Sequence, residues 1–360
     1  MNMETKKQLI RKAEDETLNT LKMIHPGIFM LDCRFDYALD KLLETGVTDV
    51  LGMARFIQKQ ARTLRPVLNT KPDGFACSAF NAEDPSGHVL MGRNFDYKES
   101  PCVVLWTHPE NGYRSINTLT VNFMAYGIKH QRIDRIRRPS RLIGSPYVCM
   151  DGMNEKGLAI AILEIKAEPT KQRTGRTPVI PPAIVRAVLD RCASVGEAVA
   201  EFEKYDMNDL IGVNYHYMLA DATGAGAIVE YVDDRMHVIY PDNGGGLVLT
   251  NYFLTESGNN ERGRGFDRRD DIISGLGSCG GVLGDMRAME LLSSATLFYK
   301  HPKYPHMVTT CWSSVFDMTG GTQLTCCSMD YSKAYRFSVF SPCEYEELAT
   351  GINFVKTERH

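Results

Sequence analysis

Apolar residues recur at helical spacing within residues 9–64 and predict three helices there. The first apolar face comprises Leu9, Ile10, Ala13, Thr17, Leu18 and Leu21, and His25-Pro26-Gly27 stops this helix. The second comprises Phe35, Ala38, Leu39, Leu42 and Leu43 and ends at Gly46, and the third comprises Val50, Ala54, Ile57, Ala61 and Leu64. A polar, turn-rich segment follows at residues 69–74. This patterning is too regular for a disordered tail and predicts a helical unit over residues 1–76.

From residue 77 onward, short runs typical of strands alternate with helical segments. We expect strands at residues 77–81, 88–94, 102–107, 119–123, 158–163, 216–220, 227–231, 236–240 and 246–250. Helices are expected at residues 184–192, 194–202, from 267 onward and around 286–293. The pattern alone predicts only a mixed α and β body.

The first two expected strands enclose the turn Asp84-Pro85-Ser86-Gly87 and therefore predict a hairpin. Such a hairpin would bring Arg93 and Asp96 back beside Cys77. A cation near a thiol lowers its pKa and favours the nucleophilic thiolate. The residues alone leave a second interpretation open, in which Cys77 is a small core residue and the other two form a surface ion pair.

The run Gly92-Arg93-Asn94-Phe95-Asp96-Tyr97, with Cys77 before it, resembles the N-terminal-nucleophile (Ntn) hydrolases that use cysteine. These include choloylglycine hydrolases, penicillin V acylases, acid ceramidase and its N-acylethanolamine-hydrolysing relative. The resemblance extends to about Val339 and implies an α+β fold, the four-layer αββα sandwich of these enzymes. It also implies a helical prosegment, residues 1–76, cut off at the Ala76–Cys77 bond, and a catalytic domain over residues 77–360. The prosegment of the ceramidase branch stays bound after cleavage, and we expect the same here.

Four further stretches carry the resemblance, and the last of them, residues 309–316, resembles the family's closing core strand. Residues 151–158 match a turn between core strands, and the strand after it ends at Glu164, where bile salt hydrolases have asparagine. Glu164 is therefore a possible site residue, with Glu168 as a competitor. Thr250-Asn251 matches the family's oxyanion-hole asparagine, and Asp267-Arg268-Arg269 matches a motif whose first arginine belongs to the site.

The resemblance implies a role for each residue. The freed α-amine of Cys77 would serve as base, Asp96 would hold the resulting ammonium, and Arg93 would stabilise the thiolate. Asn251 would hold the oxyanion, and Arg268 completes the catalytic set. Candidate pocket aromatics, each of which also suits a plain core position, are Phe95, Tyr97 and Trp106. The implied activity is hydrolysis of a linear N-acyl amide, a small-molecule substrate with an apolar acyl arm, through a thioester. An acyltransferase and a catalytically silent, zymogen-like binding protein remain alternatives.

The composition of the chain limits which classes of molecule we expect it to bind. With 41 basic and 44 acidic residues the net charge is −3, so no overall field attracts nucleic acid. A basic run at residues 129–141 suits either a solvated loop or an anionic rim. No cofactor and no metal site are expected, because no metal-binding cysteine or histidine spacing occurs. The charged residues 1–7 lack the apolar run of a signal peptide, and no transmembrane segment is evident, which predicts a cytoplasmic protein with free thiols. The sequence leaves open whether the chain forms a homo-oligomer.

Overall fold

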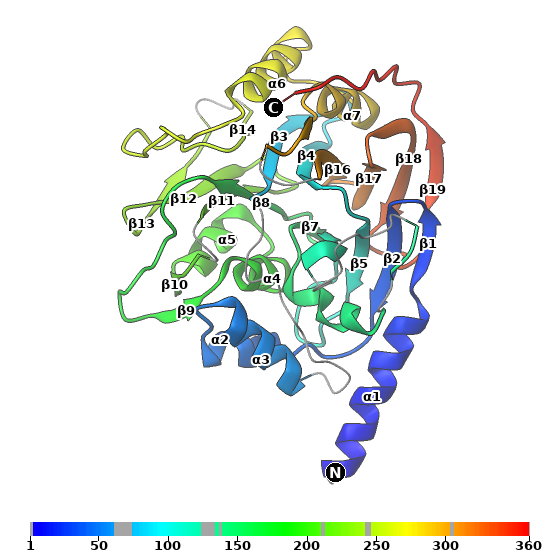
Figure 1. Cartoon of the computed structure of the whole chain (residues 1–360), viewed down its shortest axis with the longest axis vertical. Coiled ribbons are helices and arrows are strands. Elements are labelled where there is room, and N and C mark those ends of the chain that lie inside the picture. The colour runs from blue at the N-terminus through cyan, green and yellow to red at the C-terminus, as the bar shows by residue number, and fades with distance from the viewer. Residues whose placement is uncertain are drawn as a thin grey trace.

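The computed structural model describes residues 3–60, 74–123, 134–136, 139–209, 213–241, 246–302 and 306–359, and two large sheets dominate this part of the chain (Figure 1). The first sheet has nine strands in the order β1 (Lys22–His25), β2 (Ile28–Cys33), β5 (Cys102–Thr107), β6 (Ser115–Thr120), β7 (Asp151–Asn154), β8 (Ala159–Ile165), β11 (Asn214–Ala220), β12 (Gly226–Val232) and β13 (Arg235–Ile239). The second sheet has eight, namely β14 (Val248–Leu249), β3 (Ala76–Glu83), β4 (Val89–Lys98), β16 (Met307–Asp317), β17 (Thr322–Cys327), β18 (Asp330–Ser338) and β19 (Glu346–Ala349), with β15 (Phe298–Lys300) paired to β16. A separate small pair joins β9 (Thr177–Val179) to β10 (Tyr205–Met207).

Helices cover the outer faces of the two sheets. The first sheet is covered by α4 (Pro181–Arg191) and α5 (Val195–Phe202), which contact β7, β8, β11 and β12. The second sheet is covered by α6 (Phe266–Ser278) and α7 (Asp285–Ser294), which contact β3, β4, β14 and β16 (Figure 1). Because β3 also contacts β8, the two sheets face each other. This confirms the predicted α+β, four-layer αββα sandwich.

The predicted hairpin forms. Strands β3 and β4 pair antiparallel, so that Cys77 lies opposite Phe95 and Ala79 lies opposite Arg93. Opposite residues share a face of the sheet, and the turn between the strands closes at Gly87, whose φ of 83° suits glycine. Strand β8 is buried at every position because α4 covers one of its faces and β3 the other. The hairpin therefore presents Cys77 to the interior between the sheets.

The N-terminal part contains the three predicted helices, α1 (Met3–Asn19), α2 (Leu39–Thr45) and α3 (Val50–Gln60), but it is not helical throughout. Strands β1 and β2 lie between α1 and α2, and β2 pairs in parallel with β5. The helical interpretation missed β2 because all six of its residues are buried, so its sequence lacks the alternation of a half-exposed strand. Residues before Cys77 therefore extend the first sheet.

Other expectations deviate locally. The strand expected at residues 119–123 is the end of β6 followed by a 3-10 turn, η1 (Val121–Phe123), and a longer 3-10 segment, η2 (Pro139–Tyr147), precedes β7. Ser194 caps the N-terminus of α5, since its side chain accepts a hydrogen bond from the backbone nitrogen of Glu197 at 3.3 Å. Most of the basic run at residues 129–141 lies outside the described residues. No helix within the described part of the chain has the length and apolarity to span a bilayer.

Candidate active site

Cys77 is fully buried at the centre of a hydrogen-bonded network. Its backbone nitrogen donates to Asn251 Oδ1 at 2.9 Å, and its carbonyl oxygen accepts from Arg268 Nη1 at 2.8 Å. Its sulfur lies 3.9 Å from the carbonyl oxygen of Ile162 on β8. Both polar ends of this one residue are thus held by side chains that the sequence analysis had selected from distant parts of the chain.

Arg93 lies on the same inner face of the hairpin and is also fully buried. Its Nη2 donates to Ile162 O at 2.8 Å, the same oxygen that lies near the thiol, and its Nε lies 2.7 Å from Asp151 Oδ2. The guanidinium also lies over the ring of Phe95, at 5.1 Å from its centroid. These contacts hold the positive charge beside Cys77.

Arg268, on the first turn of α6, joins the remaining candidates. Its Nη1 lies 3.1 Å from Asp96 Oδ2, and its Nη2 donates to Asn251 Oδ1 at 2.7 Å. Asp96 is further held by Thr310 Oγ1 at 2.5 Å, and burial raises the pKa of Asp96 while Arg268 and this hydrogen bond oppose the rise. Arg268 is buried and its neighbour Arg269 is partly exposed, as expected for a site arginine followed by a surface one.

Glu164 holds the last residues before the predicted cleavage bond. Its Oε2 accepts from the backbone nitrogen of Phe75 at 2.8 Å, and Arg264 Nη2 lies 3.7 Å from Oε1. Its backbone oxygen accepts from Asn251 Nδ2 at 2.7 Å. A Cβ at Gly74 would lie 2.4 Å from Oε1, so this approach requires glycine. The competing candidate, Glu168, is exposed and lines a separate cavity.

Burial sets the protonation of these groups in the uncut chain. It raises the pKa of the Cys77 thiol to about 12, although Arg93 and Arg268 lower it. It also raises the pKa of Glu164 to about 7, against the opposing effects of the Phe75 N–H and Arg264. The thiol is therefore protonated at neutral pH and requires a base before it can attack a carbonyl.

Aromatic side chains line the hairpin face next to Cys77. Phe75 packs against Phe95 at 5.2 Å between ring centroids and stacks on Tyr215 at 6.0 Å. Phe123 closes this aromatic cluster, at 5.5 Å from Tyr97 and 6.3 Å from Phe75. Two predicted pocket residues, Phe95 and Tyr97, thus lie together.

The third predicted pocket residue lies elsewhere. Trp106 packs edge-on against Phe337 at 5.8 Å, and its Nε1 donates to Ser338 O at 2.8 Å. Both contacts are with β18. Trp106 lies on β5, which β6 and β7 separate from β8 in the first sheet. The structure therefore places Trp106 in the core against β18 and does not bring it together with Phe95 and Tyr97.

Sequence reasoning missed several members of the site. Asp151, which pairs with Arg93 and accepts from Trp312 Nε1 at 3.0 Å, was interpreted only as part of a turn. Thr310 was interpreted as part of a core strand, and Arg264 and Phe75 were not selected at all. A signal was available for Asp151, since a carboxylate at the start of a buried strand requires a cationic partner.

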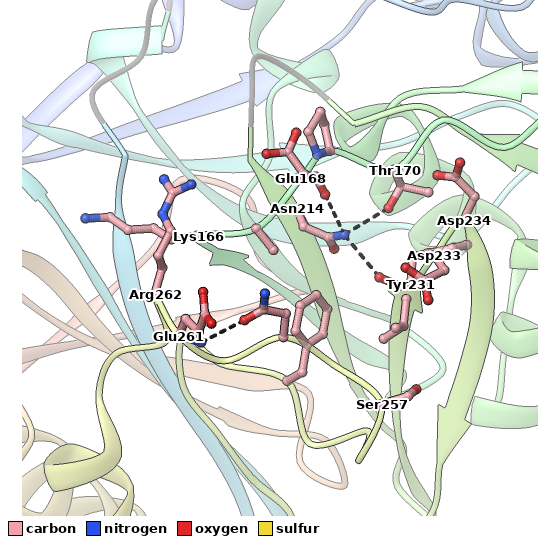
Figure 2. Close-up of a pocket in the computed structure, with 15 residues that line it drawn as sticks. Lys166, Glu168, Thr170, Asn214, Tyr231, Asp233, Asp234, Ser257, Glu261 and Arg262 are labelled. Atoms are coloured by element: carbon pink, nitrogen blue, oxygen red, sulfur yellow. Dashed lines mark hydrogen bonds between the residues drawn. The ribbon is translucent and has the colours of Figure 1, made fainter.

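A cavity of about 510 Å³ lies beyond the ends of β8 and β12 (Figure 2). Figure 2 shows Lys166 and Arg262 on one side of it and Asp233 and Asp234 on the other. Glu168 contributes its backbone oxygen to Asn214 here, at 3.1 Å. Nowhere in the described ranges do three or more histidine, cysteine or acidic residues cluster as metal ligands would.

Part of the chain is similar in sequence to known proteins. Residues 77–253 match the family model of the linear amide C–N hydrolases, choloylglycine hydrolase family. A penicillin V acylase of Pectobacterium atrosepticum is 26% identical over 191 residues, and the match spans about half of each protein, 47% of this chain and 47% of the relative.

Solved structures agree on the fold. A variant of the conjugated bile acid hydrolase from Clostridium perfringens superposes with a TM-score of 0.53 at 15% identity, covering 79% of this chain and 100% of that one. Penicillin V acylase from Agrobacterium tumefaciens gives 0.52 at 19% identity, covering 78% and 94%. At such identities the likeness is one of fold.

Proposed function

We propose that the chain, whose residues 77–253 match the family model of the linear amide C–N hydrolases, choloylglycine hydrolase family, is a self-processing cysteine amidase. It would cut the Ala76–Cys77 bond and then hydrolyse linear N-acyl amides through a thioester on Cys77. The observation that carries this proposal is the convergence of Asn251 and Arg268 on the two polar atoms of the Cys77 backbone. Buried backbone groups need hydrogen-bond partners, and here two buried polar side chains supply them where β14 does not pair with Cys77.

The processing step transfers an acyl group within the chain. Cys77 Sγ attacks the carbonyl carbon of Ala76, the C–N bond breaks as the thioester forms, and the departing nitrogen takes up the thiol proton. Water then hydrolyses the thioester, leaving a carboxylate on Ala76 and a free thiol and α-amine on Cys77. The amine, with an ordinary pKa of about 8, supplies the base that the buried thiol lacks.

Turnover of an external amide repeats the same chemistry. The α-amine takes the thiol proton, the thiolate attacks the amide carbonyl, and the ammonium protonates the leaving amine. Arg93 stabilises the thiolate, Asp96 holds the ammonium, and Arg268 holds the Asp96 carboxylate. The second N–H of Asn251 Nδ2 is the oxyanion donor, since one already serves Glu164 O.

The aromatic cluster around Phe75 favours a substrate with an apolar acyl arm. Phe75 precedes the cut bond on its acyl side and is buried among Phe95, Tyr97, Phe123 and Tyr215. The acyl-enzyme formed during processing carries Phe75 in this position. An acyl arm delivered by a substrate would occupy the same space once the prosegment end has moved away.

We also propose that residues 1–76 stay bound after cleavage. Strand β2 pairs along its whole length with β5, and all its side chains are buried. Losing it would expose an edge of the first sheet and its apolar core contacts. Cleavage breaks one peptide bond and leaves those contacts unchanged.

Mass spectrometry of the purified protein under denaturing conditions tests the proposal. We expect two fragments that meet at Ala76–Cys77, and an intact 40.4 kDa chain for Cys77→Ala. Size exclusion under native conditions should return both fragments in one peak. A full-length wild-type chain that hydrolyses amides would exclude the N-terminal-nucleophile mechanism, and a full-length inert chain would exclude self-processing.

A further inference from the structure

A buried, hydrogen-bonded His–Glu pair lies next to the backbone that carries Asn251, outside the catalytic set. His216 on β11 and Glu230 on β12 face each other with Nδ1 at 3.0 Å from Oε1, and neither side chain is exposed to solvent. The other ring nitrogen, Nε2, lies 2.7 Å from the backbone oxygen of Thr250. Thr250 directly precedes Asn251, so the pair contacts the backbone that carries the proposed oxyanion donor.

Glu230 holds the other end of the same segment. Its carboxylate accepts from the backbone nitrogen of Leu254 at 3.0 Å and from the backbone nitrogen and hydroxyl of Thr255 at 3.0 and 2.8 Å. Asn251 itself is held at the backbone by Arg264, through hydrogen bonds of 3.2 and 3.1 Å. Residues 250–255 are thus anchored at both ends by two adjacent strands of the opposite sheet.

The hydrogen-bond partners define where the protons lie. Nε2 faces a carbonyl oxygen, which only accepts, so it carries a hydrogen. The remaining neighbours of the Glu230 oxygens are all donors, so the hydrogen between the two side chains is assigned to Nδ1. Burial acts to raise the pKa of Glu230, but His216 and the backbone N–H groups outweigh it and lower that pKa. The Glu230 carboxylate therefore accepts from His216 and from the backbone of residues 254–255 at the same time.

We propose that His216 and Glu230 are positioning residues that hold Asn251 in the geometry required by the tetrahedral intermediate. This inference rests on the proposed amidase function. An oxyanion donor acts only within about 0.5 Å of its productive position, and side-chain contacts alone do not fix the backbone from which Asn251 projects. The pair restricts that backbone through Thr250 on one side and Leu254 and Thr255 on the other.

The first test compares Glu230→Ala with Glu230→Gln in the processed enzyme. The glutamine can accept from Thr255 with its oxygen and donate to Nδ1 of a neutral ring, so it retains the anchor without the charge. We expect Glu230→Ala to lower kcat roughly tenfold or more with KM within about twofold, and Glu230→Gln to restore most of the loss. A kcat unchanged in Glu230→Ala, or a loss shared equally by the glutamine variant, would overturn the proposal.

A second test uses a milder change in case Glu230→Ala does not fold. Thr255→Val removes one hydrogen bond to Glu230 from a partly exposed position. Its matched control is Thr223→Val, because the Thr223 hydroxyl bonds Asp221 in a turn elsewhere. We expect kcat to fall about three- to tenfold in Thr255→Val alone, at equal melting temperature. Equal kcat in the two variants would overturn the positioning role, whereas a wild-type enzyme without any amidase activity would instead contradict the proposed function.

Discussion

The carboxylate of Glu164 lies 2.8 Å from the backbone nitrogen of Phe75, so a strand of the catalytic body holds the residue that precedes Ala76. The same glutamate bonds Asn251 through its backbone oxygen. The end of the prosegment and the proposed oxyanion donor are therefore connected through one residue. This connection makes the uncut chain sensitive to the charge on Glu164.

The raised pKa of Glu164 predicts how the stability of the uncut chain depends on pH. Burial raises its pKa from 4.5 to about 7 in the folded chain, so between these values the folded state holds a proton that the unfolded state has lost. Stability should therefore fall as pH rises from about 4.5 to 7, by at most about 3 kcal/mol. In the Cys77→Ala background, Glu164→Gln should remove this decline.

Urea denaturation at pH 5 and pH 8 measures the effect. The control is Glu168→Gln, an exposed carboxylate near the end of the same strand, which should keep the wild-type pH dependence. An equal decline in the Cys77→Ala chain with and without Glu164→Gln would show that Glu164 is ionised throughout this range.

Asn251→Ala should lower kcat by roughly 10²–10³ in the processed enzyme while the fold is retained, because an oxyanion donor acts mainly in the transition state. Circular dichroism and steady-state kinetics on a linear acyl amide check this. A decrease under threefold would return Asn251 to a structural role at the end of β14.

The Arg93–Asp151 pair predicts that substitutions of the two residues have coupled effects on the free energy of unfolding, which a double-mutant cycle measures. Both side chains are fully buried, so Arg93→Met leaves an unpaired carboxylate and should destabilise the Cys77→Ala chain by about 3–5 kcal/mol. Adding Asp151→Leu should recover part of that loss, because no lone charge is then buried. Strictly additive losses in the double variant would contradict a direct coupling of the two residues.

Substrate preference follows from the aromatic cluster around Phe75 and from Glu164 in place of asparagine. We expect linear acyl amides with apolar arms to be hydrolysed faster than glycocholate, with broad tolerance of chain length, since one methylene alters binding by only ~1–3 kcal/mol. Initial rates on glycocholate, penicillin V, N-acyl amino acids and N-acyl ethanolamides decide this. Faster turnover of glycocholate than of every acyl amide would refute the preference.

The rate of the proposed self-processing should depend on Arg268. Arg268→Gln should slow the appearance of the two fragments, because Arg268 holds the Cys77 carbonyl and the Asp96 carboxylate together. The neighbouring Arg269→Gln is the control and should process at the wild-type rate. Electrophoresis of samples taken over time from freshly purified protein measures both rates.

The sequence by itself determined the hairpin that carries Cys77, Arg93 and Asp96, since a short turn and two regular strands need no information from elsewhere in the chain. It also identified Asn251 and Arg268 as candidate site residues, through motifs that lie at the end of β14 and the start of α6. The helices α4, α5 and α7 followed from local periodicity and capping. All of these depend on residues close together in the chain.

Only the tertiary structure decided which side chains meet across the two sheets. Asp151 contacts Arg93 and Phe75 packs against Tyr215 because sheet packing brings together residues far apart in sequence. Thr310 meets Asp96 within the second sheet, where β16 pairs with β4. The same holds for β2, whose residues are all buried, Asp32 included, and suit a strand only once β5 pairs with it. The neighbours of Trp106 were decided in the same way, because a large aromatic residue in a strand indicates burial but not the neighbours it will be buried against.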